Sequence, residues 1–163
     1  MPVETRTQEL AKELDRLAEA APSVEHLMTS IVRLLTERLE KYNWVGFYLL
    51  EKGAPTVQPA LVLGPFVGAP TPHTRIPLNQ GICGAAASNG QTIVVDDVHS
   101  DPRYLACSLE TKSEIVAPLF VRGKVAGELD IDSHLPAAFG PDDRRLVEHC
   151  ARVVGLFLEK TSA

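Results

Sequence analysis

The chain has no long hydrophobic run. Nowhere in its 163 residues is there an uninterrupted apolar stretch of about 18 residues, the length that crosses a bilayer. The first 19 residues are too polar to form the hydrophobic core of a secretory signal peptide. We therefore expect a cytoplasmic protein with no membrane partner.

Cysteine is scarce as well. Cys83, Cys107 and Cys150 form no Cys-x-x-Cys pair, and no Cys/His group occurs at zinc-binding spacing. An odd number of thiols without an export signal argues against a disulfide framework. The sequence therefore predicts no bound metal, and it leaves redox chemistry, nucleophilic chemistry or packing as roles for the thiols.

Clusters of basic residues are also missing. The 16 lysines and arginines are scattered along a chain of formal net charge −5. Binding to nucleic acid needs a concentrated basic surface that contacts phosphates, so DNA and RNA are poor candidates as partners. What the chain does have is ordinary globular composition, 45% hydrophobic and 23% charged, in a length typical of one domain. We expect a single domain over residues 1–163.

Helical periodicity marks both ends of the chain. Over about residues 8–40, apolar side chains recur at steps of three and four residues, as on one face of an amphipathic helix. Pro22-Ser23 divides this stretch into two helices. A further helix is predicted over about residues 141–160, because Gly140-Pro141 followed by two aspartates is typical of a first turn.

Strand patterns fill the middle of the chain, about residues 43–132. Residues 43–50 are rich in aromatic and β-branched side chains, and two apolar runs, residues 113–121 and 124–131, flank Arg122-Gly123. Two such runs around a two-residue turn predict a β-hairpin. The fold class is therefore α+β, with a central, mainly antiparallel sheet flanked by N- and C-terminal helices.

Several short strings follow one another in a defined order through this region. They are Asn43-Trp44-Val45-Gly46-Phe47-Tyr48, Leu61-Val62-Leu63-Gly64-Pro65-Phe66, Arg75-Ile76-Pro77, Gly81-Ile82-Cys83-Gly84, Ala106-Cys107, Ser113-Glu114-Ile115-Val116 and Leu129-Asp130-Ile131-Asp132-Ser133. In this order and approximate spacing they resemble the free methionine-(R)-sulfoxide reductases, a branch of the GAF fold. The resemblance covers about residues 43–158. The second half alone fits many GAF ligand sensors, whereas the Trp-Val-Gly-Phe-Tyr string and the first two cysteines point to the reductase branch.

The resemblance implies thiol-dependent reduction of free methionine-(R)-sulfoxide to methionine. Its pattern makes Cys107 the nucleophile and Cys83 the resolving thiol, without a cofactor and with an external reductant such as thioredoxin. The substrate pocket would be formed by Trp44, Tyr48, Glu114, Asp130 and Asp132. Members of the family commonly carry a third cysteine where this chain has His73, which is thus an auxiliary candidate in a two-cysteine relay. GAF relatives often pair through terminal helices, so a homodimer is expected by analogy.

The residues themselves suit this chemistry. Reduction of a sulfoxide needs a thiolate that attacks sulfur and an acid that protonates oxygen, and Cys107 and Glu114 can supply them. Asp130 and Asp132 point to the same face of a strand. Beside Glu114 they would crowd negative charge and raise the pKa of at least one carboxyl. A carboxylate can also bind the substrate ammonium group, and the division of these roles stays open.

Each assignment has a structural alternative. The two aspartates suit a turn, Cys83 lies among small apolar residues that suit packing, and Cys150 suits packing of the terminal helix. His73 lies in a proline-rich loop, where a histidine is commonly a surface residue. Trp44 and Tyr48 share one strand face, which forms either a pocket wall or core. The whole chain also fits a non-catalytic GAF module that senses or binds a small molecule.

Overall fold

The computed structural model describes residues 3–53, 55–105 and 109–161. These residues form four α-helices and six strands. In chain order the elements are α1 (Val3–Ala20), α2 (Val24–Arg38), β1 (Trp44–Glu51), β2 (Ala60–Val67), β3 (Arg75–Pro77), α3 (Gly81–Asn89), β4 (Ile93–Val95), a 3-10 turn (Val98–Ser100), β5 (Ser113–Val121), β6 (Lys124–Ser133) and α4 (Pro141–Thr161). α1 thus begins several residues before the apolar periodicity does. No helix among these residues is long and apolar enough to cross a membrane.

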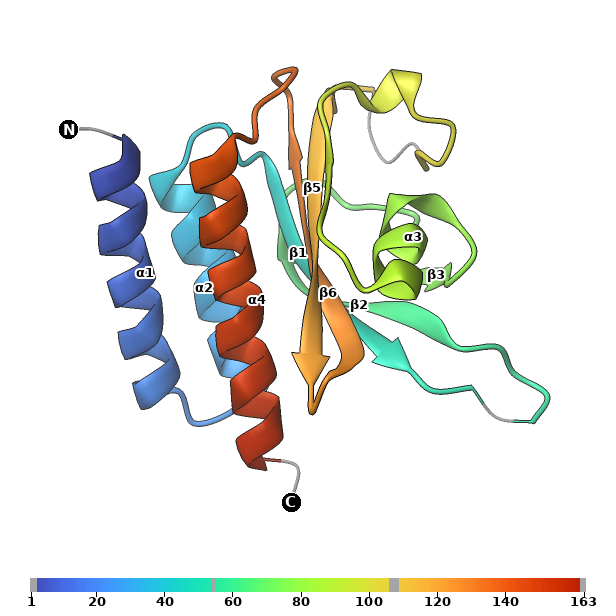
Figure 1. The fold of residues 1–163 in the computed structure, drawn as a ribbon, viewed down its shortest axis with the longest axis horizontal. Helices are drawn as coiled ribbons and strands as arrows, with labels where there is room; N and C mark the ends of the chain where they lie inside the picture. Colours follow the sequence, from blue (N-terminus) through green and yellow to red (C-terminus); the bar gives the residue numbers. More distant parts are fainter. Residues whose placement is uncertain (1–2, 54, 106–108, 162–163) are drawn as a thin grey trace.

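The strands form one antiparallel sheet in the order β3-β2-β1-β6-β5-β4. In Figure 1, α1, α2 and α4 lie on one side of this sheet, and α3 lies on the other. The α+β class, with a mainly antiparallel sheet and helices at both ends, is confirmed.

The hairpin predicted around Arg122-Gly123 lies next to the centre of the sheet. β5 and β6 pair from Ser113 opposite Ser133 to Val121 opposite Lys124. Both turn residues have positive φ, 51° at Arg122 and 78° at Gly123. This is the type I′ arrangement, which follows the right-handed twist of the two strands. On its other side β6 pairs with β1, so β6 is flanked by a strand on each edge.

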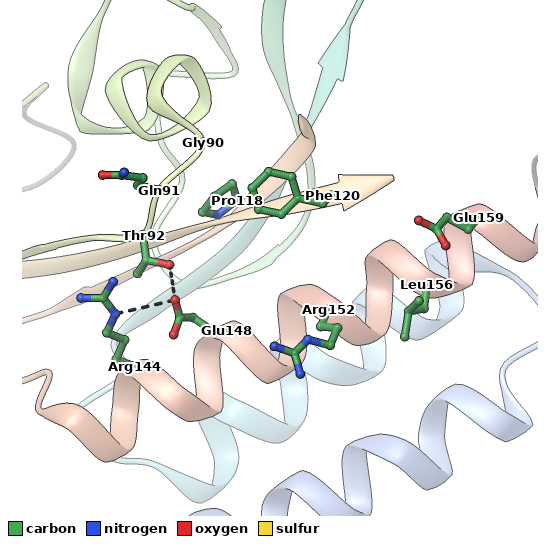
Figure 2. Close-up of a pocket in the computed structure, with 10 residues that line it drawn as sticks. All are labelled: Gly90, Gln91, Thr92, Pro118, Phe120, Arg144, Glu148, Arg152, Leu156 and Glu159. Atoms are coloured by element: carbon green, nitrogen blue, oxygen red, sulfur yellow. Dashed lines mark hydrogen bonds and ion pairs between the residues drawn. The ribbon is translucent and has the colours of Figure 1, made fainter. Parts of the chain in front are cut away.

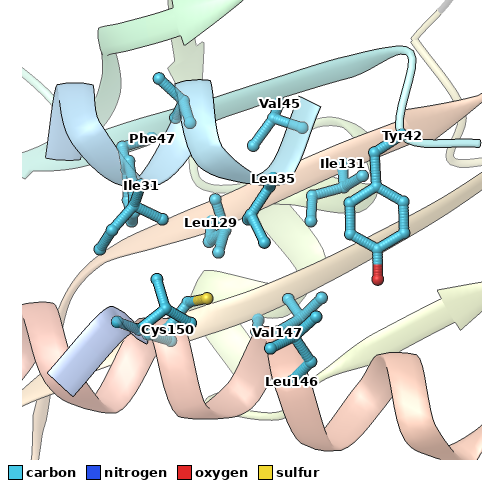
Figure 3. Close-up of a cluster of buried hydrophobic side chains, with 14 of the residues drawn as sticks. Ile31, Leu35, Tyr42, Val45, Phe47, Leu129, Ile131, Leu146, Val147 and Cys150 are labelled. Atoms are coloured by element: carbon cyan, nitrogen blue, oxygen red, sulfur yellow. The ribbon is translucent and has the colours of Figure 1, made fainter. Parts of the chain in front are cut away.

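The three long helices bury one face of the sheet. Their apolar side chains pack on alternate residues of the central strands, among them Val45, Phe47, Leu129 and Ile131, as Figure 3 shows. Full burial of a side chain of this size contributes about 1.5–3 kcal/mol to folding. Cys150 of α4 is completely buried in the same core, which supports the packing role expected for it.

Close contacts at both ends hold α4 against the rest of the fold. Near its start, the buried Asp143 carboxylate accepts hydrogen bonds from the Tyr42 hydroxyl (2.7 Å), Lys41 Nζ (2.7 Å) and the Gly140 N–H (2.9 Å). Near its other end, Gly155 faces β5 so closely that an added Cβ would lie 2.4 Å from a backbone carbonyl oxygen. The sheet face under α1, α2 and α4 is therefore tightly packed. The predicted site residues belong to the opposite face, which α3 covers.

Candidate functional site

Three carboxyl side chains of β6 lie on the sheet face that α3 covers. Glu128, Asp130 and Asp132 alternate with apolar residues that face the long helices, as the two-residue period of a strand requires. Glu114 of β5 is directly opposite Asp132. All four side chains are buried, with at most 5% exposure. Asp130 and Asp132 therefore lie within a covered sheet face, rather than in an exposed turn.

The helix α3 brings Cys83 onto these carboxyls. Its Sγ donates to Asp130 Oδ2 at 3.4 Å, across 47 residues of sequence. One possible ligand atom from each of Cys83, Glu114 and Asp130 lies within 4.8 Å of the other two. Gly84 permits this approach, because a Cβ there would lie only 3.0 Å from the Pro77 carbonyl oxygen at the end of β3. Residues predicted separately on α3, β5 and β6 thus form one cluster.

Burial dominates the electrostatics of the cluster. Removal from water raises the pKa of Glu114 well above its ordinary value, and the neighbouring Asp130 and Asp132 raise it further. Burial is also the main cause of the raised pKa values of Asp130, Asp132 and Glu128. The pKa of Cys83 is raised well above its ordinary value by burial and then by the adjacent carboxyls. The charge crowding predicted from the sequence is present, but desolvation contributes more.

An aromatic pair from β1 lies on the same face of the sheet. Trp44 and Tyr48 have ring centroids 6.4 Å apart, and Trp44 stacks on Phe66 at 5.6 Å. Gly46 lies between them and opposite Asp130 on β6, where a Cβ would lie 2.4 Å from the Trp44 ring. The glycine therefore leaves room for the indole to lie over the strand. Tyr48 is 1% exposed and packs as core, whereas Trp44 is half-buried.

Two small cavities flank the cluster. The first has a volume of about 20 Å³, and the second, lined by Trp44 and Asp132 with residues of the proline-rich loop, has about 100 Å³. The first is lined by five of the predicted residues, Tyr48, His73, Cys83, Glu114 and Asp130. The residues predicted to form one pocket thus line two separate cavities.

Of the two remaining predicted residues, His73 and Cys107, the structure describes only His73. The half-buried His73 lines the first cavity, and its backbone carbonyl accepts a hydrogen bond from the Tyr48 hydroxyl at 2.8 Å. Cys107, the predicted nucleophile, lies outside the described residues. Leu105 is the last described residue before Cys107, and it lies at the site. It lines the first cavity and lies against Gly81 at the start of α3.

Comparison with known proteins places this arrangement in a family. A sequence model of the GAF domain matches residues 23–158. The chain is 37% identical over 150 residues to the free methionine-R-sulfoxide reductase of Escherichia coli, covering 90% of this chain and 87% of that protein. This chain belongs to the GAF-domain family of free methionine-R-sulfoxide reductases. It is also 38% identical over 113 residues to the enzyme of that name from Saccharomyces cerevisiae, covering 69% of this chain and 61% of the relative.

Solved structures of family members resemble this GAF domain closely. The free methionine-R-sulfoxide reductase from Neisseria meningitidis, solved in complex with its substrate, superposes with a TM-score of 0.90 at 30% identity, covering 100% of this chain and 95% of that one. The fRMsr of Staphylococcus aureus in complex with substrate has a TM-score of 0.83 at 36% identity, covering 93% and 95% of the two chains. The likeness extends over the described site.

A cavity of this GAF domain with greater volume lies elsewhere. A groove of about 700 Å³ lies between α4 and the region of β5 and the end of α3, and Figure 2 shows the residues that line it. Glu148 on its wall accepts a hydrogen bond from the Thr92 hydroxyl at 2.7 Å and pairs with Arg144 at 3.6 Å. None of the residues predicted to form the site lines this groove. Volume alone therefore does not locate the chemistry.

Glu128 is the site residue that the sequence reasoning missed. It is 0% exposed, and its carboxyl faces the Cys83 thiol without a hydrogen bond of normal geometry. The signal that could have found it was available, because it stands two residues before Asp130 and so falls on the same face of the strand.

Proposed function

We propose that this chain reduces free methionine-(R)-sulfoxide to methionine, with Cys107 as nucleophile and Cys83 as resolving thiol. The observation that carries the proposal is the buried cluster of Cys83, Glu114 and Asp130 beside the aromatic residues of β1. Its likeness to relatives solved in complex with substrate adds support. Thioredoxin or a small thiol is the reductant that this scheme needs.

The carboxyls serve the first step. The Cys107 thiolate attacks the sulfoxide sulfur, the oxygen is protonated, methionine leaves, and Cys107 becomes a sulfenic acid. Because burial raises the pKa of Glu114, this group stays protonated at a pH where an exposed carboxyl would be ionised, and it is our candidate for the acid. Asp130 and Asp132 are assigned to the substrate ammonium group, whose positive charge at the site would favour their ionised forms. Trp44 supplies an aromatic surface for the methyl and sulfur atoms.

The setting of Cys83 favours the second step over the first. Its raised pKa keeps it a thiol, so it does not compete as the attacking thiolate. In the second step the Cys83 sulfur attacks the sulfur of the Cys107 sulfenic acid, a disulfide forms, and water leaves. Asp130, which already accepts the S–H hydrogen bond, is positioned to take the thiol proton.

Substrate binding requires the site to widen. Ligand pockets commonly have about 300 Å³ or more, whereas the cavities on either side of the cluster have about 20 and 100 Å³. Side chains between the two cavities must therefore move for methionine sulfoxide to contact Trp44 and Glu114 together.

Product formation and a thiol count test the proposal together. Wild-type protein is mixed with free methionine-(R)-sulfoxide, or with the S epimer as control, and methionine is measured without reductant and then with thioredoxin or dithiothreitol. We expect about one methionine per chain without reductant, a fall from three titratable thiols to one after denaturation, and sustained turnover with reductant.

Variants separate the two thiols. Cys107→Ser should form no methionine, whereas Cys83→Ser should complete one turnover and continue only if a small thiol reduces the sulfenic acid directly. Cys150→Ser is the matched control, since that thiol is buried between the long helices and the opposite face of the sheet. A wild-type protein that binds the sulfoxide, forms no methionine and keeps all its thiols would instead be a non-catalytic binding module.

A further inference from the structure

The cluster of Cys83, Glu114 and Asp130 has the composition of a metal site. Each residue places one possible ligand atom within 4.8 Å of the others, and all three side chains are buried. They come from α3, β5 and β6, so no local spacing in the sequence marks them as a set. A thiol and two carboxyls at this separation can surround one ion of about 2 Å bonding distance.

A second observation supports a cation site here. Both carboxyl oxygens of Glu128, and Oδ1 of Asp130, are buried without a hydrogen-bond partner among the described residues. Glu128, two residues before Asp130 on the same face of β6, lies near the Cys83 thiol. A buried carboxyl without a partner is costly, and such groups in proteins are commonly paired or bound to metal. The described ion pairs include none with Glu114, Glu128 or the aspartates of β6.

The size of the cavity suits an ion rather than an organic ligand. The space lined by Cys83, Glu114, Asp130 and His73 has a volume of about 20 Å³. That is room for roughly one water molecule. A single metal ion therefore fits the described arrangement without the widening that a methionine sulfoxide molecule requires.

We propose that Cys83, Glu114 and Asp130, with Glu128 beside them, bind one Zn²⁺ ion. Zn²⁺ takes thiolate and carboxylate ligands in fourfold coordination, whereas Mg²⁺ and Ca²⁺ select sites made only of oxygen. Three ligands come from the cluster, water completes the fourth position, and Glu128 lies beside the Cys83 thiol as a neighbouring carboxyl. On binding, the sulfur–zinc bond forms, and the Cys83 thiol and the protonated Glu114 carboxyl release their protons to solvent.

The site overlaps the one assigned above to the sulfoxide. Zn²⁺ and methionine sulfoxide then compete for the same carboxyls, and the ion holds the resolving thiol in an inactive form. This consequence rests on the proposed function, whereas metal binding itself does not. Binding is therefore measured without turnover.

Cobalt supplies the direct test. The full-length chain is reduced, freed of metal with a chelator and titrated anaerobically with Co²⁺, which reports a thiolate ligand by charge-transfer absorption in the near ultraviolet. We expect saturation at one ion per chain and displacement by one equivalent of Zn²⁺. Glu128→Gln should weaken Co²⁺ binding about 10-fold or more, while Glu148→Gln, a carboxyl in the remote groove, should leave it unchanged.

Cysteine variants identify the ligand. The charge-transfer band should disappear in Cys83→Ser and remain in Cys107→Ser and Cys150→Ser, with circular dichroism confirming that each variant is folded. No saturable binding to wild type, or a band that survives Cys83→Ser, would overturn the proposal. A chain that reduces no sulfoxide can still bind Co²⁺, and an active reductase can fail to bind it, so the two proposals fail separately.

Discussion

Replacing Glu128 with methionine should make the metal-free protein more stable. Both oxygens of this carboxyl are buried without a partner among the described residues, and the side chain is 0% exposed. It lies next to Cys83 and, on the neighbouring strands, opposite Tyr48 and Pro118. Methionine has a similar length and a flexible, apolar side chain that fills irregular space. Glu128→Met thus removes a buried polar group with little change in volume.

The size of the gain follows from the cost of burying an unpartnered polar group. That cost is about 1–3 kcal/mol per group. In a domain of this size, 1 kcal/mol shifts the melting temperature by about 2–4 °C. The melting temperature of Glu128→Met should therefore rise by about 2–12 °C, measured with a chelator present so that no metal binds the wild-type carboxyl.

The gain should depend on pH. Burial raises the folded-state pKa of Glu128 well above the ordinary value of 4.5. The stabilisation linked to such a shift is fully present below the unfolded pKa and is lost as the pH rises through the folded pKa. The wild type therefore loses stability relative to the variant as the pH rises above about 4.5. Glu128→Gln keeps a polar group but cannot ionise. It should therefore show the pH-dependent part of the stability gain over wild type, but not the part that comes from removing a buried polar group.

Thermal and urea unfolding of wild type and Glu128→Met at pH 5 and pH 8 test this prediction. The advantage of Glu128→Met over wild type should be larger at pH 8. If the variant is less stable than wild type at both pH values, or if its advantage is independent of pH, the Glu128 carboxyl has a stabilising partner in the folded protein and the prediction is wrong. Saturating Zn²⁺ should narrow or reverse the difference, since only the wild type retains the carboxyl beside the zinc ligands and binds the ion with full affinity.

Three further changes probe the supporting structure. Gly155→Ala should lower the free energy of unfolding by about 1–3 kcal/mol, because its Cβ would lie 2.4 Å from a backbone oxygen of β5; an unchanged urea midpoint would refute the close approach. Asp143→Ala removes the acceptor of the buried Tyr42 hydroxyl and of the Gly140 N–H, leaves Lys41 Nζ with only the Ala138 carbonyl, and should cost about 2–4 kcal/mol. The half-buried Asp142→Ala, compared in the same thermal melts, should cost less. Cys150→Ala should cost about 1 kcal/mol through the cavity it leaves, and methionine formation per folded chain should not change; a loss of turnover would contradict the packing role of this thiol.

Much of the architecture was predictable because it depends on short-range patterns. The two-residue period placed Asp130 and Asp132 on one strand face, and applied one step further it would have included Glu128. Arg122-Gly123 between two β-branched runs predicted the hairpin, since few residue pairs adopt the backbone angles that such a turn needs. These features depend on residues only a few positions apart.

The site itself depends on contacts that no local pattern encodes. The sulfur of Cys83 reaches Asp130 across 47 residues because α3 packs on the sheet at a small-residue surface. The absence of zinc spacing in the sequence says nothing about such a group. The sequence determined which side chains carry charge and which strand face they occupy. Only the tertiary structure decided that they are covered, and because that cover removes water, it decided which of them keep their protons.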